Sequence, residues 1–219
     1  MQYNRSAGVT LIIGVAAPLL IIGMHPTAGD LTGDSGSRQV VVNYLVHGVA
    51  LAAQPLVFLG LLGVSRYLEW SETAIAALVV YGFGIVAVVP AAVLSGFVAP
   101  DVIERMRVTG ATPDARYEAL LAYTGFLNQG FARINVIASG VAVTLWGCAM
   151  WRTRRFPRAT ALIGVVVGTA LAVGTLIGYL RLNVQGIVTV TLVQATWMIL
   201  VAVHLLRANG VPAVRASAV

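Results

Sequence analysis

The chain has 219 residues, of which 58% are hydrophobic and only 10% are charged. A soluble domain carries about 25% charged residues, because all of its sides face water. The composition therefore excludes an ordinary soluble domain and favours a protein whose solvent is a lipid bilayer. The formal net charge is +6, but the arginines lie in short segments between apolar runs. That distribution is typical of membrane topology and not of a nucleic-acid-binding face.

Six apolar segments are each long enough to cross a bilayer core, which takes about 20 residues for a thickness of about 30 Å. Backbone polar groups in lipid must be hydrogen-bonded within the chain, so each segment is predicted to be an α-helix. The predicted helices cover residues 7–24, 40–64, 74–99, 119–151, 159–180 and 187–206. The first follows a single arginine and lacks a clear cleavage site, so we interpret it as a retained helix and not as a signal peptide. The sequence thus predicts an all-α, polytopic transmembrane bundle, with residues 1–219 as one domain.

Arginine placement predicts the orientation of this bundle. The loop between the fourth and fifth predicted helices carries Arg152, Arg154, Arg155 and Arg158 beside aromatic residues. The positive-inside rule places such a loop in the cytoplasm. Both termini are then predicted to be cytoplasmic too, because the number of spans is even.

Three local patterns refine the predicted helices. Residues 101–108 alternate apolar and charged side chains by helical turn, which predicts a helix lying in the membrane interface. Thr112 and Pro113 then predict the start of the fourth helix, with threonine as the cap and proline in the first turn. Pro55 and Pro90 are predicted to kink or loosen the second and third helices.

The second predicted helix carries one ordered polar stripe. At 100° per residue, Asn43, His47 and Gln54 lie on the same face. Polar side chains on one stripe should face protein or water and not lipid. One interpretation is a site that opens outward, with His47 as a ligand, a base or a proton acceptor. The alternative is a buried stripe that bonds neighbouring helices.

The fourth predicted helix carries two polar lines. Gln129 and Arg133 belong to one, and Asn128, Asn135 and Ser139 form another about 100° away. Arg133 is the one charge within a predicted span. It either faces the bundle as a partner for an anion or extends outward to the interface. We favour the inward orientation, because Gln129 and several small residues share its face.

The first functional hypothesis is a pocket lined by these polar residues, which are predicted to lie at a similar depth in the membrane. The turn between the last two helices places Arg181 on the same side of the membrane as His47 and Arg133. An outward-facing pocket would bind or pass a small polar or anionic solute, and its candidate ligand-binding residues are Asn43, His47, Gln129, Arg133 and Arg181.

A second hypothesis is a membrane-embedded, metal-dependent enzyme. His25, Asp30 and Asp34 of the first outer loop, together with His47, offer two imidazoles and two carboxylates for a metal ion. Their spacing is not diagnostic, and solvated loop residues are the alternative. The sequence contains no phosphate-binding glycine loop, no zinc-binding histidine helix and no cysteine pair, so it does not identify a cofactor.

A third hypothesis is an accessory subunit of a membrane complex, held by helix packing. Gly164, Gly168, Gly174 and Gly178 lie within one face of the fifth predicted helix. Such glycines let a neighbouring backbone approach closely. They therefore predict close packing, either within the chain or between copies in an oligomer.

Three segments carry a resemblance to known proteins: Met24-His25-Pro26-Thr27-Ala28-Gly29-Asp30, Ser95-Gly96-Phe97-Val98-Ala99-Pro100 and Asn128-Gln129-Gly130-Phe131-Ala132-Arg133. With its six helices, the chain resembles uncharacterised bacterial membrane families named only as domains of unknown function. The resemblance implies a location in the bacterial inner membrane. It supplies no activity and no catalytic residue.

Overall fold

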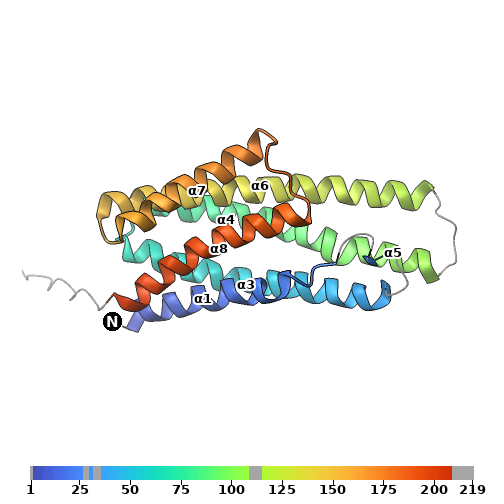
Figure 1. Ribbon diagram of the computed structural model, residues 1–219, viewed down its shortest axis with the longest axis horizontal. Coiled ribbons are helices and arrows are strands. Elements are labelled where there is room, and N and C mark those ends of the chain that lie inside the picture. Colours follow the sequence, from blue (N-terminus) through green and yellow to red (C-terminus); the bar gives the residue numbers. More distant parts are fainter. Residues whose placement is uncertain (1, 27–29, 32–35, 109–114, 209–219) are drawn as a thin grey trace, which may run out of the picture.

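The computed structural model describes residues 2–26, 30–31, 36–108 and 115–208. Within this part of the chain, six helices are long and apolar enough to span a membrane. They confirm the predicted all-α, polytopic architecture, and Figure 1 shows them side by side in an elongated bundle. In chain order the elements are α1 (Gln2–Ile22), α3 (Gly36–Tyr67), α4 (Glu72–Val93), the π-helical turn η1 (Leu94–Val98), α5 (Ala99–Val108), α6 (Ala115–Thr153), α7 (Arg158–Leu176) and α8 (Val184–Arg207).

The bundle has two chemically different ends (Figure 1). The start of α1, the α3–α4 turn, the α6–α7 loop and the end of α8 lie at one end, which we call the basic end because it holds the predicted cytoplasmic arginines. At the opposite end, which we call the α5 end, α3, α5 and α6 extend furthest. The even number of spans places the first and last helix ends together at the basic end. Its cytoplasmic orientation stays a prediction of the positive-inside rule.

Glycines divide the six long helices into two closely packed groups. In the first group, a Cβ on Gly60 of α3 would lie 2.6 Å from Leu11 Cβ of α1, and one on Gly8 of α1 would lie 2.9 Å from the Ala202 carbonyl oxygen of α8. In the second group, a Cβ on Gly140 of α6 would lie 2.8 Å from the carbonyl oxygen of Gly168 on α7. Helix α4 joins the second group through its packing along α6. We call α1, α3 and α8 the first group, and α4, α6 and α7 the second group.

Near the basic end, large side chains join the two groups. Trp197 of α8 donates its indole N–H to the Thr160 carbonyl oxygen at the start of α7 (3.1 Å). Trp146 of α6 donates to Ser65 Oγ of α3 (2.9 Å), and Ser65 in turn donates to the Ala74 carbonyl oxygen of α4 (3.2 Å). Both indoles are completely buried. The groups therefore share one continuous apolar core at this end.

The segment predicted as an interfacial helix is helical and continues the third span. It forms α5, which continues the third span through η1 and lengthens the bundle at the α5 end (Figure 1). The helix is therefore continuous with the third span, and its position in the membrane interface stays a prediction. The reason is local, because a π-helical turn keeps the chain helical up to Pro100, and the first turn of a new helix tolerates proline.

Other helix ends differ from the predicted ones. Helix α7 ends at Leu176, four residues early, because Gly178 takes a positive φ of 75° and the Leu180 N–H bonds back to the Gly174 carbonyl oxygen (2.9 Å). Pro55 leaves α3 unbroken. The predicted start of the fourth helix at Thr112 and Pro113 lies outside the described residues.

Candidate functional site

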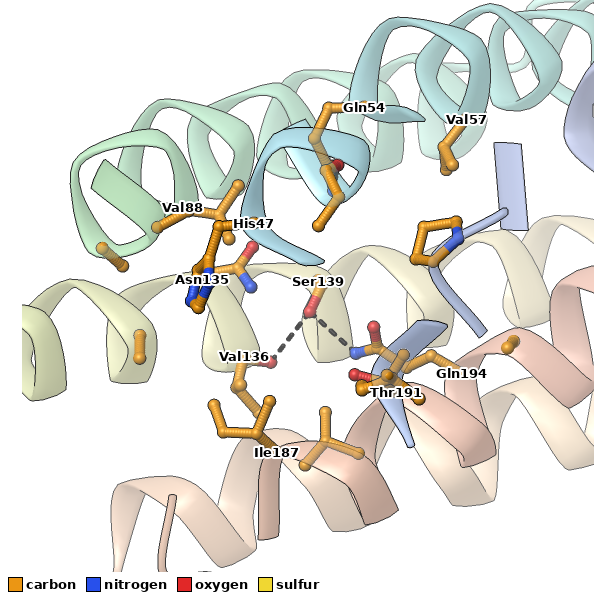
Figure 2. A pocket seen from close by; sticks show the side chains of 18 of the residues that line it. His47, Gln54, Val57, Val88, Asn135, Val136, Ser139, Ile187, Thr191 and Gln194 are labelled. Carbon is orange, nitrogen blue, oxygen red and sulfur yellow. Dashed lines mark hydrogen bonds between the residues drawn. The ribbon is translucent and has the colours of Figure 1, made fainter. Parts of the chain in front are cut away.

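A cavity of about 250 Å³ lies between the two helix groups. Side chains from α1, α3, α4, η1, α6 and α8 line it, together with His25, and Figure 2 shows several of them from close by. His47 and Ser95 line it near the α5 end, whereas Val57 and Met198 line it deeper in the bundle. Its walls are mainly apolar, with uncharged polar groups between. Among the described residues, no carboxylate and no guanidinium lines this cavity.

The π-helical turn exposes two carbonyl groups beside the cavity. The Ala99 N–H bonds to the Leu94 carbonyl oxygen, five residues back. In a regular α-helix it would bond to the Ser95 carbonyl oxygen, four residues back, so that carbonyl lacks its usual partner. Gly96 lacks a regular partner as well, because Pro100, four residues on, has no N–H to donate. Buried carbonyls without a partner are costly, so another part of the chain must supply donors here.

Asn43 of α3 supplies those two donors. Its side-chain amide donates to the Ser95 carbonyl oxygen (2.9 Å) and to the Gly96 carbonyl oxygen (3.0 Å). An amide NH₂ has two hydrogens, one for each carbonyl. Asn43 is only 1% exposed, so α3 of the first group is fixed to η1 of the second group by a fully buried contact.

His47 lies one turn further along α3 and reaches the same segment. Its Nδ1 donates to the Asn43 backbone carbonyl oxygen (3.0 Å), and its Nε2 lies 2.9 Å from Ser95 Oγ. With the proton on Nδ1, the neutral ring accepts the Ser95 hydroxyl hydrogen at Nε2. The same hydroxyl hydrogen has the Ala91 carbonyl oxygen (3.0 Å) as an alternative acceptor. A Cβ on Gly96 would lie 2.4 Å from His47 Cβ, so only glycine lets the ring lie this close to η1.

Another hydrogen bond crosses between the groups on the other side of the cavity. Gln194 of α8 donates to Ser139 Oγ of α6 (2.8 Å), and Ser139 donates to the Val136 carbonyl oxygen (3.2 Å), as the dashed lines in Figure 2 show. Asn135 and Thr191 also line the cavity, and their side chains have no hydrogen-bond partner among the described residues. The cavity thus offers amides and a hydroxyl to an occupant.

The structure brings together only part of the predicted ligand-binding set. Asn43 and His47 meet at η1, and His47 lines the cavity. Gln129 instead donates to the Leu182 carbonyl oxygen (3.0 Å) and thereby holds the α7–α8 turn. Arg133 and Arg181 are exposed and are not among the lining residues. The favoured inward orientation of Arg133 is therefore not the one observed.

Sequence reasoning overlooked the other α6 line as cavity lining. Asn128, Asn135 and Ser139 line the cavity, whereas the small residues that share the Arg133 face pack against α7. Gln194 could also have pointed to the cavity, because a glutamine in the middle of a span needs a polar partner within the bundle. Ser139, across the cavity, is that partner.

The predicted metal ligands are partly assembled. The His25 and His47 rings meet edge to face with centroids 5.0 Å apart. Asp30 is exposed, and Asp34 lies outside the described residues. No group of three or more described His, Cys, Asp or Glu residues is placed to hold a metal ion. A metal site at this position stays a prediction.

Two of the four glycines predicted as a packing face serve contacts within the chain. A Cβ on Gly164 would lie 2.7 Å from the Trp197 indole nitrogen, and one on Gly168 would lie 2.5 Å from the Gly140 carbonyl oxygen. Gly178 lies in the turn after α7. Packing within the chain accounts for Gly164 and Gly168, and oligomerisation through this face stays a prediction.

Comparisons of the chain with protein-family models, with curated proteins and with solved structures found no match. No family is thereby identified, and what stands of the resemblance is the layout of six long apolar helices.

Proposed function

We propose that this multi-pass membrane protein binds, or passes, a small uncharged molecule that has both apolar and polar parts. The binding site is the cavity between the two helix groups. We further propose that the protein resides in the bacterial inner membrane with the α5 end facing outward, as its arginine distribution predicts.

The chemistry of the cavity lining carries this proposal. Apolar side chains make up most of the wall, and Asn128, Asn135 and Thr191 add hydrogen-bonding groups without partners among the described residues. Pockets for small molecules typically combine an apolar wall with a few polar groups that fix orientation. The volume of about 250 Å³ lies just below the range of about 300–1,000 Å³ that is typical of pockets for drug-sized ligands, which suits a small molecule.

The same lining argues against an anionic solute. An ion taken from water into a mainly apolar site needs an opposite charge or several strong hydrogen bonds. The arginines expected to supply that charge, Arg133 and Arg181, are exposed on the outside of the bundle. A neutral ligand is therefore the better fit to the cavity.

A thermal-stability screen of the purified protein tests this proposal. Neutral primary amides and their carboxylate analogues would be compared as matched pairs at equal concentration. We expect stabilisation by amides and not by carboxylates, because a ligand at about 100 times its Kd adds about 2.7 kcal/mol to the free energy of unfolding. Thr191→Phe, which fills the cavity, should abolish the stabilisation.

Thr196→Phe is the matched control for that screen. Thr196 lies on the same helix as Thr191 but is exposed on the outer face of α8, so this variant should retain the amide response. Stabilisation by carboxylates alone would favour the anionic solute. An equal response in the two variants would place binding outside the cavity and contradict the proposal.

The second candidate function is a metal-dependent enzyme at the edge-to-face contact of His25 and His47, where a metal would have to replace Ser95 at His47 Nε2. Two imidazoles at one site are typical ligands of zinc and copper. If they hold a metal, His47→Ala should lower the metal content of the purified protein, whereas His204→Ala should not. His204 lies at the basic end, where its Nε2 bonds to the Arg155 carbonyl oxygen (2.9 Å). Equal metal content in wild type and His47→Ala would exclude this function.

A further inference from the structure

We propose that the contact between α3 and η1 is the gate of the cavity. Asn43 and His47 form one side of this gate, and Ser95 and Gly96 form the other. In the observed state α3 and η1 are in contact, and their separation widens the access of the ligand to the cavity. This inference rests on the proposed function, because it concerns access to the same cavity.

The two ends of the bundle are joined in different ways. Near the basic end, the groups share a continuous apolar core in which Trp146 and Trp197 are fully buried. Near the α5 end, hydrogen bonds from Asn43 and His47 hold α3 of the first group against η1. Tyr44 of α3 adds a stacked contact with Phe97 of η1 and a hydrogen bond to Asp101 of α5. Separating the groups at the basic end would expose large apolar side chains and leave buried voids. Separation of α3 from η1 exposes the stacked rings of Tyr44 and Phe97 but no completely buried indole, and its other exposed groups are polar and can bond water.

The π-helical turn lets the polar contact break at low cost. The Ser95 and Gly96 carbonyl groups lack their usual helical partners, so they depend on the Asn43 amide. When α3 moves away, incoming water can bond these carbonyls and the Asn43 amide instead. The exchange replaces protein hydrogen bonds by hydrogen bonds to water, and the net free energy of such an exchange is small. The helix itself need not unfold.

Gly96 allows the gate to close. His47 lies directly against its backbone, because a Cβ there would be 2.4 Å from His47 Cβ, 2.5 Å from Cγ and 2.9 Å from Cδ2. Cβ and Cγ lie on the bond about which the imidazole ring rotates, so ring rotation cannot move these two atoms away. Any larger residue at position 96 should therefore hold α3 and η1 apart.

Cysteine accessibility tests the gate without knowledge of the ligand. The chain has one cysteine, so Cys148→Ser gives a cysteine-free background in which Thr191→Cys reports on the cavity. The probe is N-ethylmaleimide, a small neutral reagent, applied to the folded protein in detergent. We expect Asn43→Ala to raise the labelling rate about three- to tenfold, the effect of losing one or two interhelical hydrogen bonds on an open–closed equilibrium. Gly96→Ala should raise it as well, by wedging the contact apart.

Leu45→Ala is the matched control. Leu45 lies on the same helix between Asn43 and His47, but its side chain is 61% exposed and does not line the cavity. Its loss should leave the labelling rate unchanged. Melting curves for each variant separate opening of the gate from unfolding, since a rate that rises only in proportion to global unfolding contradicts the proposal.

The outcomes distinguish the gate from the proposed function. Equal labelling in the reporter background and in Asn43→Ala and Gly96→Ala would overturn the gate and leave the binding cavity intact. No labelling of Thr191→Cys in any folded variant, with full labelling after denaturation, would overturn both, because no neutral molecule would then reach the cavity. Faster labelling in both gate variants, with Leu45→Ala unchanged, is the expected result.

Discussion

Gly168→Ala is expected to lower the free energy of unfolding by about 1–3 kcal/mol, the usual cost of forcing extra volume into a packed contact. The added Cβ would lie 2.5 Å from the Gly140 carbonyl oxygen and 2.6 Å from the Thr144 backbone nitrogen. Both atoms belong to the α6 backbone, so no side-chain rotation relieves the clash and α7 must move away from α6. Thermal unfolding of the purified protein in detergent measures the change.

Gly174→Ala provides the control on the same helix. The nearest atom to its added Cβ would be Leu180 Cβ at 3.8 Å, an ordinary van der Waals distance. Replacing a helical glycine with alanine gains up to about 1 kcal/mol in helix propensity, so this variant should be neutral or slightly stabilised. Equal destabilisation of both variants would mean that the α6–α7 contact is not the cause. No destabilisation of Gly168→Ala would show that the two backbones are not in close contact.

The six spans were predictable because the bilayer imposes their length and requires their backbones to be helical. Helix ends were less predictable, because they depend on backbone conformations that many sequences can adopt. Gly178 ended α7 early through its positive φ, although a hydrophobic run continues through Leu180. The π-helical turn keeps the third span helical into α5, and a hydropathy pattern cannot predict such a turn.

The second helix was interpreted correctly as a polar face turned towards protein. Asn43 and His47 lie together there, and both interpretations of the stripe have some support, since Asn43 bonds a neighbouring helix while His47 also lines the cavity. Their partner was not predictable from α3 alone. It consists mainly of backbone carbonyl groups, which every residue has, and they are available only because of the π-helical turn.

The fourth helix shows why two polar lines on one helix are difficult to rank. The prediction favoured the line with Arg133, because small residues share its face. Those small residues mark close helix contact, since Gly140 and Gly147 lie against the α7 backbone. A cavity needs room as well as polarity, and the line with Asn135 and Ser139 offers both. Glycines that share a helix face with polar residues are therefore stronger evidence for close helix packing than for a binding site.

Trp197→Ala is expected to lower the free energy of unfolding by about 3–5 kcal/mol, near the upper limit for single substitutions. The indole is completely buried. Its ring lies against Gly164, and its N–H bonds to the Thr160 carbonyl oxygen. Truncation leaves a large void and a carbonyl without its partner, at the point where α8 of the first group meets α7 of the second. Thermal unfolding is again the measurement.

Two comparisons identify the source of that loss. Trp151→Ala removes an indole that is 50% exposed and lies beside Arg158, so about 1 kcal/mol or less should be lost. Trp197→Phe keeps most of the apolar volume and removes the N–H, so its loss should be intermediate, near the value of about 1 kcal/mol for one hydrogen bond plus a small void. A loss in Trp151→Ala as large as in Trp197→Ala would contradict a fixed core at the basic end. That fixed core is what the gate requires, because the two groups can separate at the α5 end only if they stay joined at the other.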